Sequence, residues 1–349
     1  MTSKGSVTLP LLSHLAMIAT ALVSVMLSAC APTVAPTAIP GAAIDRTPAL
    51  STDRYTAADG TALPVTFWPA EGQPKAVILG LHGFGDYRKA WDEPAQLWAK
   101  EGITTVAYDQ RGFGASPTRG RWPGTDALAT DAKAMVQLLR ARYPCLPIYL
   151  VGESMGGAVA LVAADRGAEV DGLVLLATAL RSRDTIGPMA SASLWFFAHT
   201  LPWLPSGPTS IDYKPTDNPA TLDKLRTDPM ILRQVRLDMG YGLVDLMDDA
   251  RDSAGRVGSP YLLLHGLGDR IVPQQPVRAA IEIMPPRADS KLAFYKEGYH
   301  LLLRDKAGKT VAVDVAAWIS DRNAPLPSGA DAIGSQPGLA ASWGSKRTR

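Results

Sequence analysis

The sequence contains few of the residues that bind metals or form disulfides. Its 349 residues include two cysteines and five histidines, with no Cys-x-x-Cys pair and no histidine cluster. This scarcity argues against a zinc site, and we expect no metal. A large excess of one charge is also missing, because the formal net charge is +2 and the one dense basic group is Lys346, Arg347 and Arg349 at the C-terminus. We therefore expect no nucleic-acid partner.

The N-terminus has the pattern of an export signal. Residues 1–8 are polar with one positive charge at Lys4, residues 9–29 are almost wholly apolar, and small residues precede Cys30. These features predict a signal peptide over residues 1–29. The run Leu27-Ser28-Ala29-Cys30 resembles the lipobox of bacterial lipoproteins, which implies a Cys30 that carries fatty acids such as palmitate. An uncleaved anchor and plain secretion are the alternatives, since about 20 apolar residues can span a bilayer.

Several acyl chains on one cysteine would hold the protein stably on a membrane. We therefore expect a lipid-anchored protein of the bacterial cell envelope. Ala31 lacks the acid that often signals inner-membrane retention, which favours the outer membrane, facing the periplasm. Residues 30–51 are rich in Ala, Pro and Thr, and residues 323–349 are poor in large apolar side chains. We expect a disordered tether and a disordered tail there.

Between residues 52 and 322 the pattern alternates between strand and helix. Short apolar runs such as 76–81 and 148–151 are typical of strands buried on both faces, and segments such as 126–142 and 155–165 are typical of helices. This alternation predicts an α/β protein with a mostly parallel sheet and helices on both faces. Residues 181–255 interrupt it with aromatic residues and prolines, and we expect a helical cap over the carboxyl edge of the sheet.

A candidate nucleophile lies between a predicted strand and a predicted helix. Gly152-Glu153-Ser154-Met155-Gly156 matches the G-x-S-x-G motif in the context that this motif requires. The sharp turn exposes the serine hydroxyl, and the glycines leave space where strand and helix nearly touch. The sequence therefore predicts Ser154 as the nucleophile of a serine hydrolase.

A serine hydroxyl needs a base, and the base needs a carboxylate that orients it. His300 follows a predicted strand and is the last histidine of the chain, and Asp269 follows the preceding predicted strand. Their order fits the Ser-Asp-His sequence of this triad type. His82, His199 and His265 fit the role of base less well, and Asp245, Asp248 and Asp249 are rival acids in the cap.

An acyl-transfer site also needs donors for the oxyanion. We expect them to be the main-chain N–H groups of Phe84, in the run His82-Gly83-Phe84-Gly85-Asp86, and of Met155. We interpret His82 as a support for that loop and residues 109–116 as structural turns. No organic cofactor is required.

Five runs resemble the monoacylglycerol lipase and lysophospholipase branch of the α/β hydrolases, which includes serine aminopeptidase-like members. The runs are LHGFGD, YDQRGFGAS, VGESMGG, LHGLGDRIVP and EGYH, in the family's order over about residues 75–305. The resemblance implies an α/β-hydrolase fold with an eight-stranded sheet and hydrolysis of an ester with one long acyl chain. Asp86-Tyr87-Arg88 departs from the Glu or His followed by Ser that is common in monoacylglycerol lipases.

Two other functions fit the same motifs. An aminopeptidase or amidase would use the same triad, with an acid of the cap to bind a free amino group. A non-catalytic envelope lipoprotein would retain the fold as a binding module, although the complete triad argues against this.

Overall fold

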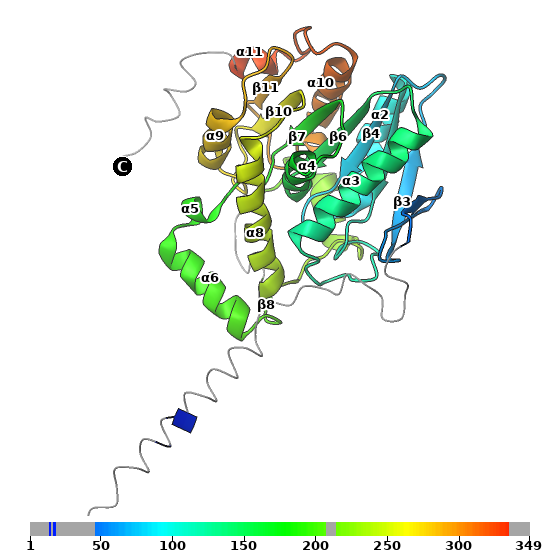
Figure 1. Ribbon diagram of the computed structural model, residues 1–349. Coiled ribbons are helices and arrows are strands. Elements are labelled where there is room, and N and C mark those ends of the chain that lie inside the picture. The colour runs from blue at the N-terminus through cyan, green and yellow to red at the C-terminus, as the bar shows by residue number, and fades with distance from the viewer. Residues whose placement is uncertain (1–13, 15–16, 19–45, 207–213, 335–349) are drawn as a thin grey trace, which may run out of the picture.

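The computed structural model describes residues 46–206 and 214–334, together with residues 14, 17 and 18 (Figure 1). Its main sheet has nine strands in the order β1-β2-β3-β5-β4-β6-β7-β10-β11. The strands are β1 (Ala49–Leu50), β2 (Arg54–Thr56), β3 (Ala62–Trp68), β4 (Ala76–Leu81), β5 (Ile103–Tyr108), β6 (Ile148–Glu153), β7 (Gly172–Leu176), β10 (Tyr261–Gly266) and β11 (Lys291–Tyr295). From β5 to β11 every pair of neighbours is parallel, whereas β1, β2 and β3 are antiparallel.

The mostly parallel sheet is confirmed, but the predicted count of eight strands is wrong. The additional strand is β1 (Ala49–Leu50), which lies within the segment predicted as a tether over residues 30–51. Leu50 packs against the hydrophobic core, so the folded part begins before residue 52.

Helices cover both faces of the sheet, as predicted (Figure 1). The helices α3 (Thr125–Arg142), α4 (Met155–Asp165), α8 (Leu237–Ala254) and α9 (Gln274–Ile283) share one hydrophobic cluster. The helices α2 (Asp92–Lys100) and α10 (Gly308–Ser320) belong to the cluster on the other face, where Trp98 and Trp318 are fully buried. The central strands β4 and β6 are buried along their whole length, which explains their continuous apolar runs.

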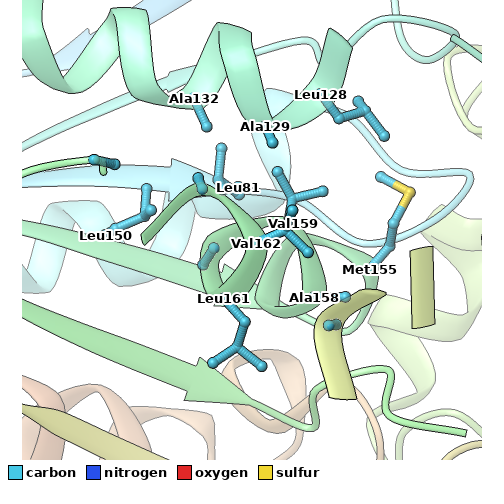
Figure 2. Close-up of a cluster of buried hydrophobic side chains, with 14 of the residues drawn as sticks. Leu81, Leu128, Ala129, Ala132, Leu150, Met155, Ala158, Val159, Leu161 and Val162 are labelled. Carbon is cyan, nitrogen blue, oxygen red and sulfur yellow. The ribbon is translucent and has the colours of Figure 1, made fainter. Parts of the chain in front are cut away.

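The helix α4 lies at the centre of the larger cluster. Figure 2 shows Val159 on the side of α4 that faces α3 and Leu161 on the side away from α3, and both belong to this cluster. Small residues along α4 let its backbone approach its neighbours closely. A methyl group on Gly157, for example, would lie 2.5 Å from the Thr178 hydroxyl. This packing holds the start of α4 rigidly against the sheet.

The chain between β7 and β10 contains four helices in its described part. These are α5 (Arg183–Ile186), α6 (Pro188–Thr200), α7 (Pro219–Thr227) and α8, and a two-stranded ribbon joins β8 (Pro205–Ser206) to β9 (Val235–Arg236). We call α5–α8 the cap. The α6 side chains Trp195, Phe196 and Phe197 are about half exposed. Trp203, shortly after the end of α6, is exposed to a similar extent. The described helices include none long and apolar enough to cross a bilayer.

The C-terminal segment corrects the predicted tail. Residues after Arg322 continue into α11 (Ala330–Gly334), which packs beside β11. Leu326 and Ala330 are buried, and the Ser328 N–H donates to Asp314 Oδ1 over 3.0 Å. The prediction of disorder from residue 323 is therefore wrong as far as residue 334. The buried apolar residues of this segment, Leu326 and Ala330, are too few to form a periodic pattern in the sequence. Residues 335–349, Cys30 and, apart from residues 14, 17 and 18, the predicted signal peptide lie outside the described residues.

Candidate active site

Ser154 occupies a strained turn between β6 and α4. Its φ angle is +54°, a conformation that non-glycine residues adopt at a cost of about 1–3 kcal/mol. The Ser154 N–H donates to the carbonyl oxygen of Leu176 in the adjacent strand over 2.9 Å. A Cβ atom on Gly156 would lie 2.0 Å from the Leu81 carbonyl oxygen, and one on Gly152 would lie 2.3 Å from the Gly156 carbonyl oxygen. The close approach of strand and helix therefore requires both glycines of the motif.

Two main-chain N–H groups beside Ser154 have no acceptor among the described residues. One belongs to Phe84, in the loop after β4, and the other to Met155, the first residue of α4. A Cβ atom on Gly83 would lie 3.5 Å from Ser154 Cβ, so this loop is directly adjacent to the serine. Free N–H groups at a helix N-terminus and in a neighbouring loop are the donors that an oxyanion requires.

His82 supports the loop that carries Phe84. It is fully buried, its Nδ1–H donates to the Gly83 carbonyl oxygen over 2.9 Å, and its Nε2 accepts the Gln110 N–H over 3.0 Å. Burial lowers the pKa of His82, in keeping with a neutral ring that donates at one nitrogen and accepts at the other. The ring of Phe113, from the turns after β5, packs edge-on against both His82 and Phe84.

Asp269 and His300 form a buried hydrogen-bonded pair. The distance between Asp269 Oδ2 and His300 Nδ1 is 2.8 Å. The other carboxylate oxygen accepts the N–H groups of Ile271 and Val272 over 2.8 and 3.0 Å. Burial acts to raise the pKa of Asp269, but the hydrogen bond and charge of His300 and the Val272 N–H outweigh it and lower this pKa. The carboxylate is therefore held in its ionised form and in a fixed orientation toward His300.

Ser154 and His300 line one cavity of about 610 Å³ at the carboxyl edge of the sheet. Neither the Ser154 hydroxyl nor His300 Nε2 is hydrogen-bonded to another described residue, so both are available to a substrate. Apolar side chains from the loops, α5, α7 and α8 form most of the wall: Phe84, Ala179, Ile186, Pro215, Leu225, Ile231, Leu232, Leu243, Met247, Ile271, Val272 and Leu301. The charged lining residues are Asp86, Arg181 and Arg304, besides His300.

The rival residues lie in other settings. Asp245 and Asp248 both form ion pairs with Arg183, and neither lines the cavity. His265, the penultimate residue of β10, is fully buried, and neither of its ring nitrogens has a hydrogen-bond partner among the described residues. Burial, assisted by the nearby His300 and opposed by the charge of Asp269, lowers the pKa of His265 to about 4. His199 stacks on Trp195 in α6. Within the described residues, no group of three or more His, Cys, Asp or Glu could hold a metal ion.

Sequence reasoning assigned no role to Arg181 or Arg304, although both line the cavity. The carboxylate partners of Arg304 are 218 and 151 residues away in the sequence. No local pattern could therefore have predicted its place in the site.

Comparison with known proteins places these features in a family. The family described as Serine aminopeptidase, S33, matches residues 72–307. Monoglyceride lipase of Rattus norvegicus is 30% identical over 276 residues, which cover 76% of this chain and 89% of the relative. The chain belongs to the S33 family. Monoacylglycerol lipase of Mycolicibacterium smegmatis is similar to this S33 protein too, with 24% identity over 76% of this chain and 95% of the relative.

Solved structures agree with the S33 protein in fold. A soluble variant of monoglyceride lipase from Saccharomyces cerevisiae, in complex with a substrate analog, has a TM-score of 0.65 at 20% identity. The match covers 83% of the S33 protein and 100% of the yeast chain. Monoacylglycerol lipase from Paleococcus ferrophilus has a TM-score of 0.64 and covers 74% of the S33 protein and 99% of its own chain. The fold is that of the α/β hydrolases, and the S33 protein is a serine hydrolase that cleaves carboxylic esters.

Proposed function

We propose that the protein hydrolyses esters of one long acyl chain, such as monoacylglycerols or lysophospholipids, through Ser154, Asp269 and His300. The observation that supports this proposal most strongly is the buried Asp269–His300 hydrogen bond of 2.8 Å. His300 lines an apolar cavity that Ser154 also lines. This arrangement supplies a nucleophile, an oriented base and space for an acyl chain at one place.

The reaction would proceed in two halves. Ser154 Oγ attacks the ester carbonyl carbon while His300 Nε2 takes its proton, and the Phe84 and Met155 N–H groups stabilise the oxyanion. The tetrahedral intermediate collapses, and His300 returns the proton to the leaving alcohol. Water, deprotonated by His300, then attacks the acyl-enzyme and releases the fatty acid and free Ser154. Asp269 stays ionised throughout and stabilises the imidazolium.

The cavity wall supports an acyl substrate. A saturated chain gains about 0.8 kcal/mol for each CH₂ group that leaves water for an apolar wall, and most of the lining side chains here are apolar. The cavity also contains one charged residue with no recorded partner among the described residues, Arg181. A cation there favours an ester whose alcohol carries a phosphate, so we include lysophospholipids beside the monoglycerides named for the relatives.

The acids of the site offer little to an aminopeptidase substrate. Asp86 is the one acidic residue among the described lining residues, and it is paired with Arg304 over 2.6 Å. Asp245 and Asp248, which were candidates for binding a free amino group, are paired with Arg183. An ester substrate therefore fits this site better than a peptide with a free amino terminus.

A substrate panel tests the proposal. Purified protein and its Ser154→Ala variant are assayed on monoacylglycerols, lysophospholipids, p-nitrophenyl esters and aminoacyl anilides. We expect turnover of the long-chain esters, little turnover of the anilides, and loss of at least about 10³-fold in the Ser154→Ala variant. Faster cleavage of the anilides would identify an amidase. Absence of both turnover and fluorophosphonate labelling in the native protein would favour a binding module.

We further propose that Cys30 carries a lipid and that the folded domain works at a membrane of the cell envelope. The Leu27-Ser28-Ala29-Cys30 run supports this, and the exposed aromatic side chains of α6 suit a lipid surface. Replacement Cys30→Ala should move the protein from the membrane pellet to the soluble fraction. Its retention in the pellet would instead support an uncleaved anchor.

A further inference from the structure

Arg304, in the wall of the cavity, joins two buried carboxylates. Its Nη1 donates to Asp86 Oδ2 over 2.6 Å, and its Nη2 donates to Glu153 Oε2 over 2.6 Å. The arginine side chain is 11% exposed, and those of Asp86 and Glu153 are 9% and 3% exposed. We call these three residues the ion triad.

Each member of the ion triad belongs to a different catalytic segment. Asp86 lies two residues after Phe84, and its N–H donates back to the Gly83 carbonyl oxygen over 3.2 Å. Glu153 is the last residue of β6 and directly precedes Ser154. Arg304 lies four residues after His300, at the end of the 3-10 turn Leu302–Arg304. The ion triad therefore links the oxyanion loop, the nucleophile turn and the histidine loop.

The main chain of Arg304 extends this linkage to the cap. Its carbonyl oxygen accepts the hydroxyls of Thr216 and Thr221 over 3.2 and 2.9 Å. The Leu301 N–H, beside His300, donates to the Pro215 carbonyl oxygen over 2.9 Å. The cap and the histidine loop are thus held together at the same point.

Stability alone gives a weak reason for such a cluster. A buried ion pair gains little net free energy over apolar residues of similar volume, because desolvation offsets the attraction. This cluster also holds two carboxylates for one guanidinium. What a planar guanidinium does offer is two hydrogen bonds in fixed directions, which locks two partners at a set separation.

We propose that Arg304 is a positioning residue that sets the relative placement of the oxyanion donors, Ser154 and His300. This inference rests on the proposed function. Arg304 acts through Asp86 and Glu153, not on the ester itself. A displacement of about 1 Å in a catalytic group can reduce the rate about 10²-fold, so loss of the ion triad should lower kcat by roughly this factor. The binding of a short, soluble ester depends on the apolar wall and should change little.

The test separates positioning from general stability. The Arg304→Met, Arg304→Lys and native proteins are titrated to completion with a fluorophosphonate, and kcat and KM on a soluble p-nitrophenyl ester are expressed per labelled site. We expect kcat per site to fall about 10²-fold in Arg304→Met and about tenfold in Arg304→Lys, which keeps the charge but lacks the planar group that holds the two carboxylates at a set separation. KM should stay within about threefold of native in both.

Arg111→Met provides a matched control. Arg111 is also buried between two carboxylates, those of Asp59 and Asp131, but none of the three lines the cavity. This variant should lower the thermal midpoint, because it leaves buried carboxylates unpaired, yet keep kcat per site within about twofold of native.

A second variant guards against misfolding of Arg304→Met. The combined change Asp86→Asn, Glu153→Gln and Arg304→Met leaves no uncompensated charge, so it should fold while kcat per site stays low. Native kcat per site in any folded Arg304 variant, with only a lowered thermal midpoint, would overturn the positioning role. If both variants that contain Arg304→Met fail to fold, Arg304→Lys provides the test: a lowered kcat per site supports the positioning role, and a native kcat per site overturns it. Failure of the proposed function would look different, because the native protein itself would then show no turnover.

Discussion

Replacement of Asp269 by asparagine tests the buried pair with almost no change of shape. In the native protein, Asp269 Oδ1 accepts two loop N–H groups and Oδ2 accepts the Nδ1–H of His300. The asparagine oxygen can continue to accept the loop N–H groups. Its amide NH₂ then faces His300 and requires a lone pair at Nδ1. The imidazole proton moves to Nε2, which can no longer accept the proton of Ser154.

The expected loss follows from this change of tautomer. The corresponding substitution in a Ser-His-Asp protease lowers kcat about 10⁴-fold, and we expect the same order here. At about 1.36 kcal/mol for each factor of ten, this corresponds to roughly 5–6 kcal/mol of transition-state stabilisation. Phe84, Met155 and the apolar wall are unchanged, so KM should stay near its native value.

The assay is steady-state hydrolysis of a p-nitrophenyl ester by Asp269→Asn and native protein at pH 8, with circular dichroism to verify folding. Asp248→Asn is the control, because Asp248 is a cap acid paired with Arg183 and does not line the cavity. It should keep kcat within about threefold of native. A folded Asp269→Asn protein with near-native kcat would refute the reasoning and would show that another acid orients His300.

Three further predictions concern stability. Gly156→Ala should reduce the free energy of unfolding by several kcal/mol and lower the urea midpoint sharply, because its methyl group would lie 2.0 Å from a β4 carbonyl oxygen. Gly258→Ala, with open space around it, is the control and should be nearly neutral. Equal urea midpoints for the two variants would contradict this. A chain ending at residue 334 should match the full chain in thermal midpoint. A chain ending at residue 322 should melt several degrees lower, because it loses Leu326, which is 3% exposed. Equal thermal midpoints of the two shortened chains would show that residues 323–334 contribute nothing to stability. The pKa of His265 lies at about 4 in the folded protein against an ordinary 6.5, so the unfolded chain binds more protons between these values and stability falls as pH drops through that window. Between pH 7 and pH 5, the free energy of unfolding from urea titrations should therefore fall by about 2 kcal/mol less in His265→Leu than in the native protein. An equal fall in both proteins would contradict a lowered pKa of His265.

The central part of the fold could be predicted because its signals are local. Runs such as 76–81 and 148–151 are apolar throughout since both of their faces are covered, and Gly152 and Gly156 mark a turn that admits no side chain. Ser154, Asp269 and His300 each lie in the turn or loop that follows a strand, namely β6, β10 and β11, so their order in the chain is the order of these strands. The carboxyl ends of parallel strands meet at one edge, which the sequence pattern could anticipate.

Other features depend on contacts that the sequence does not display. The strand Ala49–Leu50 is too short to show alternation, and α11 is held by a few residues after a polar stretch. The engagement of Asp245 and Asp248 by Arg183 removes them as candidates for substrate binding, but it joins residues 62 and 65 positions apart. Such long-range polar contacts form only after the fold has placed the segments.

The most direct test of the central claim is to trap the covalent intermediate. The protein is mixed with a long-chain p-nitrophenyl ester, quenched in acid within the first turnovers, digested and analysed by mass spectrometry. We predict one added acyl group on the peptide that contains Ser154, and a larger trapped fraction when deacylation is slow. An acyl group on a different residue, or active protein that never carries one, would contradict the account.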